Sequence, residues 1–223
     1  MQITKDKDIR FISHLEYVRT IGRAIRRAKL PAAYSEGFNP HLKFSLASAL
    51  GVGVVSYTEF VEIELAEPME VEKAALALDA ALPRGIRVLA ADAVDTHHAA
   101  LMSQAAGASY RVTLPYSKDV SVAVAEFNAA PELLFKKAAK AKFKDIDVKF
   151  YIPQLTAEQT ETETIFSFDC KITPTGSMKA VDLLNALNEQ YGLALPVEMA
   201  DIERLRLYRN NKNGKRNLRL ILA

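Results

Sequence analysis

The order of strand-like and helix-like segments constrains the fold of this chain more than any other feature of its sequence. Residues 1–95 show the order β-α-β-β-α-β, and residues 109–223 show nearly the same order with an added C-terminal β-hairpin. This order is typical of the ferredoxin-like unit, in which two helices cover one face of an antiparallel sheet. The sequence therefore predicts an α+β fold of two tandem ferredoxin-like (βαββαβ) units with antiparallel sheets, joined by a linker at residues 96–108.

A helix predicted at residues 14–29 has the clearest pattern in the first half. Ser13 and Glu16 have the spacing of a capping box, and Pro31 ends the helix. Its predicted buried face consists of five residues at helical spacing, Leu15, Val18, Ile21, Gly22 and Ile25.

The other predicted elements follow from alternation, periodicity and turn residues. The first half is expected to hold strands at 1–11, 58–65 and 86–93, a helix at 71–82, and an extended segment at 34–47 interrupted by Gly37-Phe38-Asn39-Pro40. The second half is expected to hold strands at 110–115, 133–139, 145–153, 164–173, 201–209 and 216–222, and helices at 120–129 and 178–191. Asn213-Gly214 is the turn signal of the last hairpin.

Composition excludes several classes of site. Cys170 is the only cysteine among 223 residues, so an intramolecular disulfide and a cysteine-based iron–sulfur cluster are excluded. The first residues lack the apolar stretch of a signal peptide, and no segment has the length and apolar character of a membrane span, so we expect a cytoplasmic protein with no membrane partner. The net charge of +2 predicts no partner by itself. No nucleotide-binding or hydrolase motif is present, and no cofactor is expected.

Four arginines follow one side of the predicted helix at residues 14–29. Arg19, Arg23, Arg26 and Arg27 have the spacing i, i+4, i+7 and i+8, which places them opposite the predicted apolar stripe. The planar guanidinium group donates bidentate hydrogen bonds to phosphate, so the stripe is a candidate contact for nucleic acid or a nucleotide. The alternative is an ordinary solvated face with Glu16 as an ionic partner.

The segment YSEGFNPHLKF, which follows this helix, combines aromatic, amide, basic and glycine residues. Aromatic rings stack on bases, and amide, hydroxyl and imidazole groups form hydrogen bonds at a substrate edge. Gly37 permits a positive φ or a close backbone approach. The candidate substrate-binding residues of this segment are Tyr34, Ser35, Gly37, Phe38, Asn39, His41 and Lys43. The alternative is a bulged strand pair whose aromatic rings fill the core, and Phe44 is expected to be a core residue.

Two histidines are candidates for catalysis. His14 begins the predicted helix and His41 lies in the following loop, so the two imidazoles are positioned to converge as general acid and base in RNA cleavage. A metal site that includes Glu36 lacks a convincing third ligand, and none is predicted. His97 and His98 fall in the predicted linker and are expected to be exposed. Basic residues also gather at 136–149, where we expect a solvated strand pair and a patch that attracts phosphate is the alternative. At 204–219 we expect a hairpin with one core face and one basic face.

Residues 10–65 resemble the N-terminal signature of an uncharacterised bacterial family, the radical-SAM-linked (radical-SAM-associated) proteins. The matching residues are Arg10, Phe11, Ser13, His14, Leu15, Tyr34, Ser35, Gly37, Phe38, Asn39, Pro40, His41, Lys43, Ser45, Ala47 and Gly53. Glu16 stands where the family more commonly has aspartate. The resemblance implies a radical SAM protein as partner, and because this chain has no CxxxCxxC motif it implies the role of companion.

Together these features lead to one expected function and two alternatives. We expect an accessory or substrate-binding protein, non-catalytic by itself, that binds RNA (tRNA or rRNA) through a basic cleft for a radical SAM enzyme. The first alternative is a metal-independent endoribonuclease with the fold of the CRISPR repeat-processing enzymes, based on fold-level analogy alone. The second alternative is a protein-binding scaffold.

Overall fold

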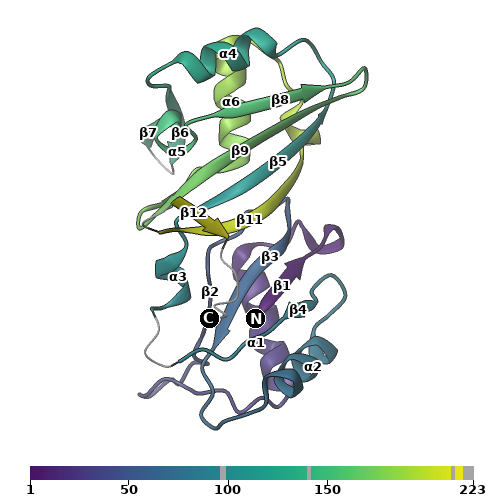
Figure 1. Ribbon diagram of the computed structural model, residues 1–223, viewed down its shortest axis with the longest axis vertical. Coiled ribbons are helices and arrows are strands. Elements are labelled where there is room, and N and C mark those ends of the chain that lie inside the picture. The colour runs from purple at the N-terminus through teal and green to yellow at the C-terminus, as the bar shows by residue number, and fades with distance from the viewer. Residues whose placement is uncertain (96–98, 140–141, 212–213, 218–223) are drawn as a thin grey trace. The chain divides into compact units, whose positions relative to one another are not determined.

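The computed structural model describes residues 1–95, 99–139, 142–211 and 214–217 (Figure 1). The chain divides into two compact units, the first comprising Met1–Ala105 and Leu207–Ala223 and the second Ala106–Arg206. Helices combine with mostly antiparallel strands in both, which confirms the predicted α+β class. The finer assignment of two ferredoxin-like units stays a prediction. No helix in the described part of the chain is long and apolar enough to cross a membrane.

The first unit combines an antiparallel sheet with two longer helices, α1 and α2, and one short helix, α3 (Figure 1). Its main elements are β1 (Gln2–Lys5), α1 (His14–Arg27), β2 (Phe44–Leu46), β3 (Val54–Ile63), α2 (Val71–Ala81), β4 (Val88–Ala90) and the short α3 (Leu101–Gln104). The strand order is β4-β1-β3-β2, and each of these pairings is antiparallel. The core of this unit includes Ile3, Ile21 and Leu78, so the sheet and both helices contribute to it.

Helix α1 forms where the sequence predicts it, with a different buried face. The Ser13 hydroxyl accepts a hydrogen bond from the Glu16 backbone N–H at 3.2 Å and so caps the helix. Tyr17 is fully buried, and its hydroxyl donates to the Thr4 carbonyl at 2.6 Å. Leu15, predicted to be buried, is 64% exposed. The face that packs on the sheet is therefore rotated towards Tyr17 and Ala24.

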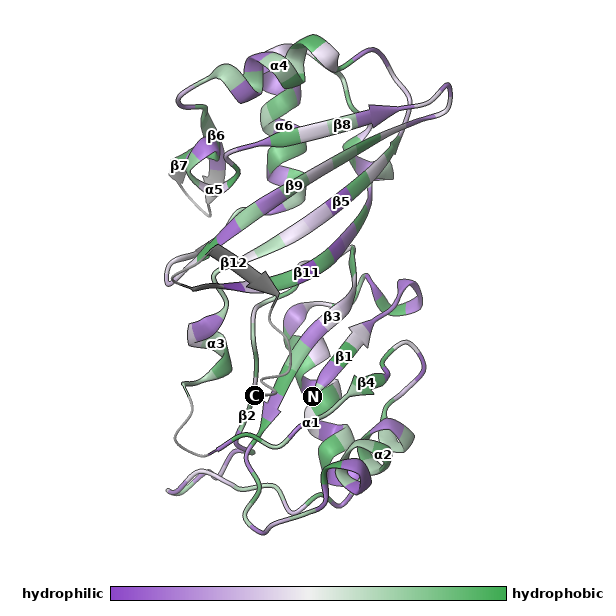
Figure 2. Cartoon of the chain, viewed as in Figure 1, coloured by the Kyte–Doolittle hydropathy of each residue, from purple (hydrophilic) through white to green (hydrophobic). Residues whose placement is uncertain are grey.

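The second unit has a longer sheet and a separate hairpin. Its elements are β5 (Gly107–Pro115), α4 (Ser121–Ala129), β6 (Leu134–Ala139), β7 (Lys142–Asp147), α5 (Val148–Tyr151), β8 (Leu155–Gln159), β9 (Glu163–Thr173), β10 (Gly176–Ser177) and α6 (Ala180–Tyr191). Strand β8 pairs with β9 and β9 with β5, both antiparallel, and β6 pairs with β7 as its own two-stranded sheet. Buried and more exposed residues alternate along β5 and β9, as expected for strands with one covered face. Figure 2 shows hydrophilic and hydrophobic residues interspersed along the same strands.

One predicted strand of this unit is a helical turn instead. The sequence predicted a strand at 145–153, whereas the structure has the end of β7 followed by α5. The Asp147 side chain accepts a hydrogen bond from the Lys149 backbone N–H at 3.0 Å, which caps the turn and competes with strand pairing. Strand β8 was not predicted at all. At the other end of the unit, Gly192 adopts φ 58° and terminates α6 as predicted.

The C-terminal residues 207–223 belong to the first unit, whereas the sequence predicted them in the second half, after the linker at residues 96–108. Strand β11 (Asp201–Asn211) runs past Arg206, where the second unit ends, and β12 (Gly214–Asn217) pairs with it. Arg209 donates a hydrogen bond from Nη1 to Oε1 of Gln104 at 3.1 Å, within the first unit. The predicted linker histidines His97 and His98, and Asn213 of the predicted turn, lie outside the described residues.

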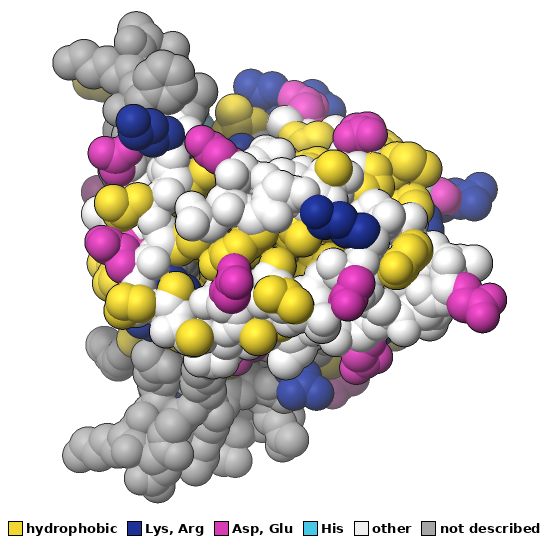
Figure 3. All heavy atoms as spheres, turned by 90° about the horizontal axis from the view of Figure 1, so that it is seen from above, with side chains coloured by type: hydrophobic (Ala, Val, Ile, Leu, Met, Phe, Trp, Pro, Cys, Tyr) yellow, Lys and Arg dark blue, Asp and Glu magenta, His cyan; other side chains and the backbone are white. Residues whose placement is uncertain are grey.

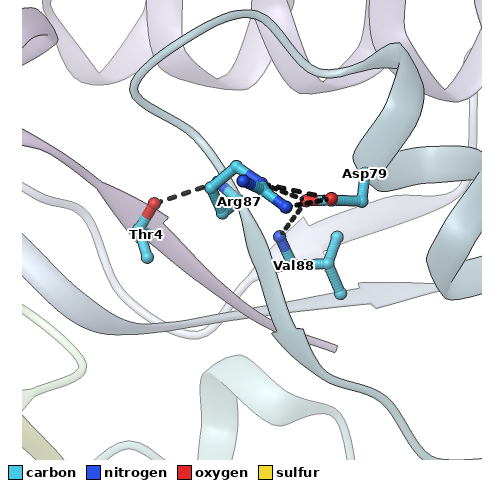
Figure 4. A network of polar contacts seen from close by, with 4 residues as sticks. All are labelled: Thr4, Asp79, Arg87 and Val88. Atoms are coloured by element: carbon cyan, nitrogen blue, oxygen red, sulfur yellow. Dashed lines mark hydrogen bonds and ion pairs between the residues drawn. The ribbon is translucent and has the colours of Figure 1, made fainter.

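A polar network holds β4 against α2 and β1 (Figure 4). The Arg87 guanidinium donates to both carboxylate oxygens of Asp79, from Nε to Oδ1 at 2.9 Å and from Nη2 to Oδ2 at 2.7 Å. Asp79 also accepts from the Val88 backbone N–H at 2.8 Å, and Arg87 N–H donates to the Thr4 hydroxyl at 2.9 Å. The Arg87 hydrogen bond, with smaller help from Val88 N–H, lowers the pKa of Asp79.

Candidate functional site

A cavity of about 240 Å³ lies between α1 and the segment that leads into β2. It is lined by eight residues: Val18, Arg19, Gly22, Arg23, Arg26, His41, Leu42 and Phe44. The first five come from one side of α1 and the last three from the chain after the loop at residues 35–40. The structure thus brings three of the four arginines of the predicted stripe and the predicted loop histidine to one site.

The apolar wall of the cavity depends on a close approach between α1 and Phe44. Gly22 has no side chain, and a Cβ atom at this position would lie 3.3 Å from Cζ of Phe44. Glycine inside a helix lowers helix stability by about 1 kcal/mol relative to alanine. The close packing of the Phe44 ring explains why glycine occupies position 22. Val18 and Leu42 extend the same apolar wall. Phe44, expected in the core, is partly buried and lines the cavity.

The polar side of the cavity is positively charged. Arg19, Arg23 and Arg26 line it together with His41 in addition to the mainly apolar wall, and none of the lining residues is acidic. Arg19 forms an ion pair with Glu16, and Arg26 is 3.5 Å from the Gly22 carbonyl oxygen. Within the described part of the chain, the side chain of Arg23 has no hydrogen-bond or ion-pair partner. At least one guanidinium therefore retains all of its donors for a ligand.

Arg27, the fourth arginine of the predicted stripe, has a different role. Its Nη2 donates to the carbonyl oxygen of Ala81 at 2.7 Å, and Arg27 is not among the residues that line the cavity. Ala81 is the last residue of α2, where carbonyl groups lack partners within the helix. Arg27 thus joins the C-terminus of α2 to the end of α1.

The loop that supplies His41 is held by a small set of backbone hydrogen bonds. Ser35 N–H donates to the His41 carbonyl at 2.8 Å, and His41 N–H donates back to the Ser35 hydroxyl at 3.0 Å. Gly37 adopts φ 113° at the tip, which a residue with a side chain rarely adopts. Lys43 forms an ion pair with Glu64 at 2.9 Å, so it is engaged within the fold and does not line the cavity.

Aromatic rings on this loop face solvent. Phe38 is fully exposed, at 112% of its reference area, and Tyr34 is also exposed. Asn39 and Pro40 beside Phe38 are exposed as well. The loop therefore presents Tyr34, Phe38 and Asn39 to solvent, and the alternative in which its aromatics fill the core does not describe Tyr34 or Phe38.

The two candidate catalytic histidines are placed differently. His41 lines the cavity, and His14, the first residue of α1, is not among the lining residues. No group of three or more His, Cys, Asp and Glu residues suited to a metal ion occurs among the residues that the structure describes.

Two lysines of the predicted basic segment at 136–149 are used by the fold, and the side chains of Lys140, Lys142 and Lys144 lie outside the described residues. Lys137 forms an ion pair with Asp182 at 2.5 Å. Lys149 donates to the carbonyl oxygens of Phe127 and Pro153 at 2.9 and 2.6 Å. On the face of this unit seen from the α4 end, basic side chains lie apart from one another among acidic and hydrophobic ones (Figure 3). Among the residues that the structure describes, this face shows no cluster of basic side chains.

Comparison with known proteins gives a family and a distant structural likeness. Residues 1–182 match the family described as an uncharacterized protein conserved in bacteria (DUF2344). No curated protein matches the chain. The chain is similar to one in the crystal structure of a Cbf5-Nop10-Gar1 complex, with 12% identity and a TM-score of 0.43. This likeness covers 86% of the present chain and 45% of the other.

Proposed function

This chain belongs to a bacterial family of uncharacterized proteins (DUF2344), and we propose that it is a non-catalytic accessory protein that binds RNA for a partner enzyme. The observation that carries the proposal is the cavity lined by three arginines and by no acidic residue. The proposal includes two ferredoxin-like units, for which the strand order β4-β1-β3-β2 of the first unit gives support.

The charge of the cavity is suited to a phosphate backbone. Guanidinium groups bind phosphate oxygens bidentately, and release of counterions from the nucleic acid favours the complex. The net charge of the whole chain is only +2, so this local concentration of like charge is not a consequence of a basic composition. Binding of this kind depends strongly on salt.

A radical SAM enzyme is the proposed partner, and the cytoplasm the proposed location. The resemblance of residues 10–65 to radical-SAM-linked proteins supports this partner. The iron–sulfur cluster of such an enzyme needs several cysteine thiolates, and this chain has one cysteine, which is buried. The accessory chain would therefore contribute substrate binding while the partner contributes the chemistry.

The test is RNA binding measured by fluorescence anisotropy over a series of salt concentrations. We expect wild-type affinity to fall as salt rises, and Arg23→Ala with Arg26→Ala to reduce the slope of log affinity against log salt by about 0.7 for each phosphate that the variant no longer neutralises. Arg84→Ala is the matched control, because Arg84 is 90% exposed and pairs with Asp8 outside the cavity. Absence of binding to total cellular RNA at low salt contradicts the proposal.

Incubation of the same labelled RNA with the protein distinguishes an RNA-binding protein from a nuclease. A histidine-dependent endoribonuclease needs two groups at one phosphate, and the cavity contains His41 alone of the two candidates. We expect labelled RNA to remain intact during incubation with the purified chain. Metal-independent cleavage that His41→Ala abolishes would identify an enzyme instead.

A further inference from the structure

We infer that this site binds RNA as unpaired nucleotides, with a phosphate held in the cavity by Arg23 and Arg26 and a neighbouring base stacked on Phe38. The inference rests on the proposed RNA-binding function and specifies the class of RNA. Its basis is the placement of a fully exposed aromatic ring beside a small basic cavity.

The exposure of Phe38 has no explanation within the fold of the first unit. A phenyl ring at 112% of its reference area removes no apolar surface from water and contributes nothing to the core. The backbone turn needs Gly37, with φ 113°, and does not need an aromatic residue after it. A ring in this position is suited to a ligand that covers its face, as a nucleobase does.

Phe38 is close enough to the cavity for one strand to contact both. His41 lines the cavity and follows Phe38 by three residues, so their Cα atoms are separated by at most about 11 Å. The hydrogen bonds between Ser35 and His41 fix the base of the loop and so restrict where its tip can lie. The ring therefore stays near the phosphate site while it remains open to solvent.

The combination favours a single strand over a duplex. In a duplex the base faces are covered by their neighbours, so stacking on a protein ring requires an unpaired base. A cavity of about 240 Å³ has room for one phosphate with part of its sugar. A duplex retains only the interaction with phosphate, whereas a loop or single-stranded segment also stacks on the ring.

The experiment compares three labelled probes: a single-stranded RNA 12-mer, the same strand annealed to its complement, and inorganic polyphosphate, which has charge and no bases. We expect wild-type protein to bind the single strand about tenfold more tightly than the duplex. Phe38→Ala should weaken single-strand binding about tenfold and leave duplex and polyphosphate binding unchanged. Phe38→Tyr, which keeps the ring, should restore the single-strand affinity.

Phe11→Ala is the matched control, because Phe11 is a second exposed aromatic of the same unit, at 70%. It should leave all three affinities unchanged. Equal binding of single strand and duplex, with Phe38→Ala like wild type, overturns the inference and leaves the proposed function standing. Binding of polyphosphate with no RNA binding in either form overturns both. All the substituted side chains are exposed, and unchanged melting temperatures establish that each variant is folded.

Discussion

Gly22 of α1 packs closely against the ring of Phe44, the first residue of β2, and a Cβ atom on Gly22 would lie 3.3 Å from that ring. A separation this short forces the neighbour to move by a few tenths of an ångström. Gly22→Ala therefore has two opposed effects, a gain in helix propensity of about 1 kcal/mol and a crowding cost against the ring.

A double-mutant cycle separates these effects. We expect Gly22→Ala to be neutral or destabilising in the wild-type chain and to stabilise the Phe44→Leu variant by about 1 kcal/mol. Urea unfolding of the four proteins measures both values. Equal stabilisation in the two backgrounds would show that the ring does not restrict this position.

The carboxylate of Asp79 should make stability depend on pH. Its pKa is lowered in the folded protein, chiefly by the Arg87 hydrogen bond, so its contribution is present above the unfolded pKa of about 3.9 and is lost as the pH falls through the folded pKa. We expect Asp79→Asn to lower the melting temperature at pH 7 by about 2–4 °C, which corresponds to about 1 kcal/mol. The difference from wild type should shrink as the pH falls below about 4. A difference in melting temperature between wild type and Asp79→Asn that stays constant from pH 7 to pH 2 would contradict a role for the lowered pKa of Asp79.

Lys5 should be important for stability even though it is a charged residue. It is buried, and its ammonium group donates to the carbonyl oxygens of Arg10, Ile12 and Gly51 at 2.8, 3.2 and 3.2 Å. Lys5→Met removes donors from these carbonyl groups, and we expect a decrease of at least about 2 kcal/mol in the free energy of unfolding. Thermal or urea denaturation measures it.

The control for Lys5 is Lys73→Met on α2. Lys73 is exposed and forms an ion pair with the exposed Glu70. Surface pairs of this kind contribute about 0–1 kcal/mol, so the change should be small. If the two substitutions have equal effects, the hydrogen bonds from Lys5 to the carbonyl groups do not stabilise the fold.

Cys170 should be unreactive in the native protein. Burial raises the pKa of its thiol to about 11, so very little thiolate is present at pH 8. We expect no reaction with a thiol reagent such as DTNB in native buffer and complete reaction in denaturant. Fast labelling without denaturant would indicate local opening around β9.

Local signals in the sequence were sufficient for several elements. Helix α1 begins at His14 as predicted because Ser13 caps it, and α2 begins at Val71 as predicted. The end of α6 could be predicted from Gly192 alone, because the residue after the helix adopts a left-handed backbone conformation that glycine adopts without steric strain. Such features depend on neighbours in the sequence and need no knowledge of the fold.

Features that depend on distant partners could not be predicted in this way. Leu15 is more hydrophobic than Tyr17 and was expected in the core, but Tyr17 is buried because Thr4 in β1 accepts its hydroxyl hydrogen bond. Likewise, the spacing of the arginines indicated a basic face. It could not show that Arg27 donates a hydrogen bond to the carbonyl oxygen of Ala81, which lies far along the chain. The apolar wall of the cavity was missed because it depends on how Phe44 packs on Gly22.

The first unit is discontinuous along the chain, since it includes Met1–Ala105 and resumes at Leu207. During synthesis the ribosome produces α1 and the loop with Phe38 before the second unit, and it must produce the whole second unit before Arg209 can form its hydrogen bond with Gln104. The segment that carries the candidate site is thus made before the second unit, and the unit that holds it is completed only after the second unit. A truncated product that ends before Leu207 would contain every residue of the cavity in an unfinished unit, so only chains that extend through β11 present the site on a complete fold.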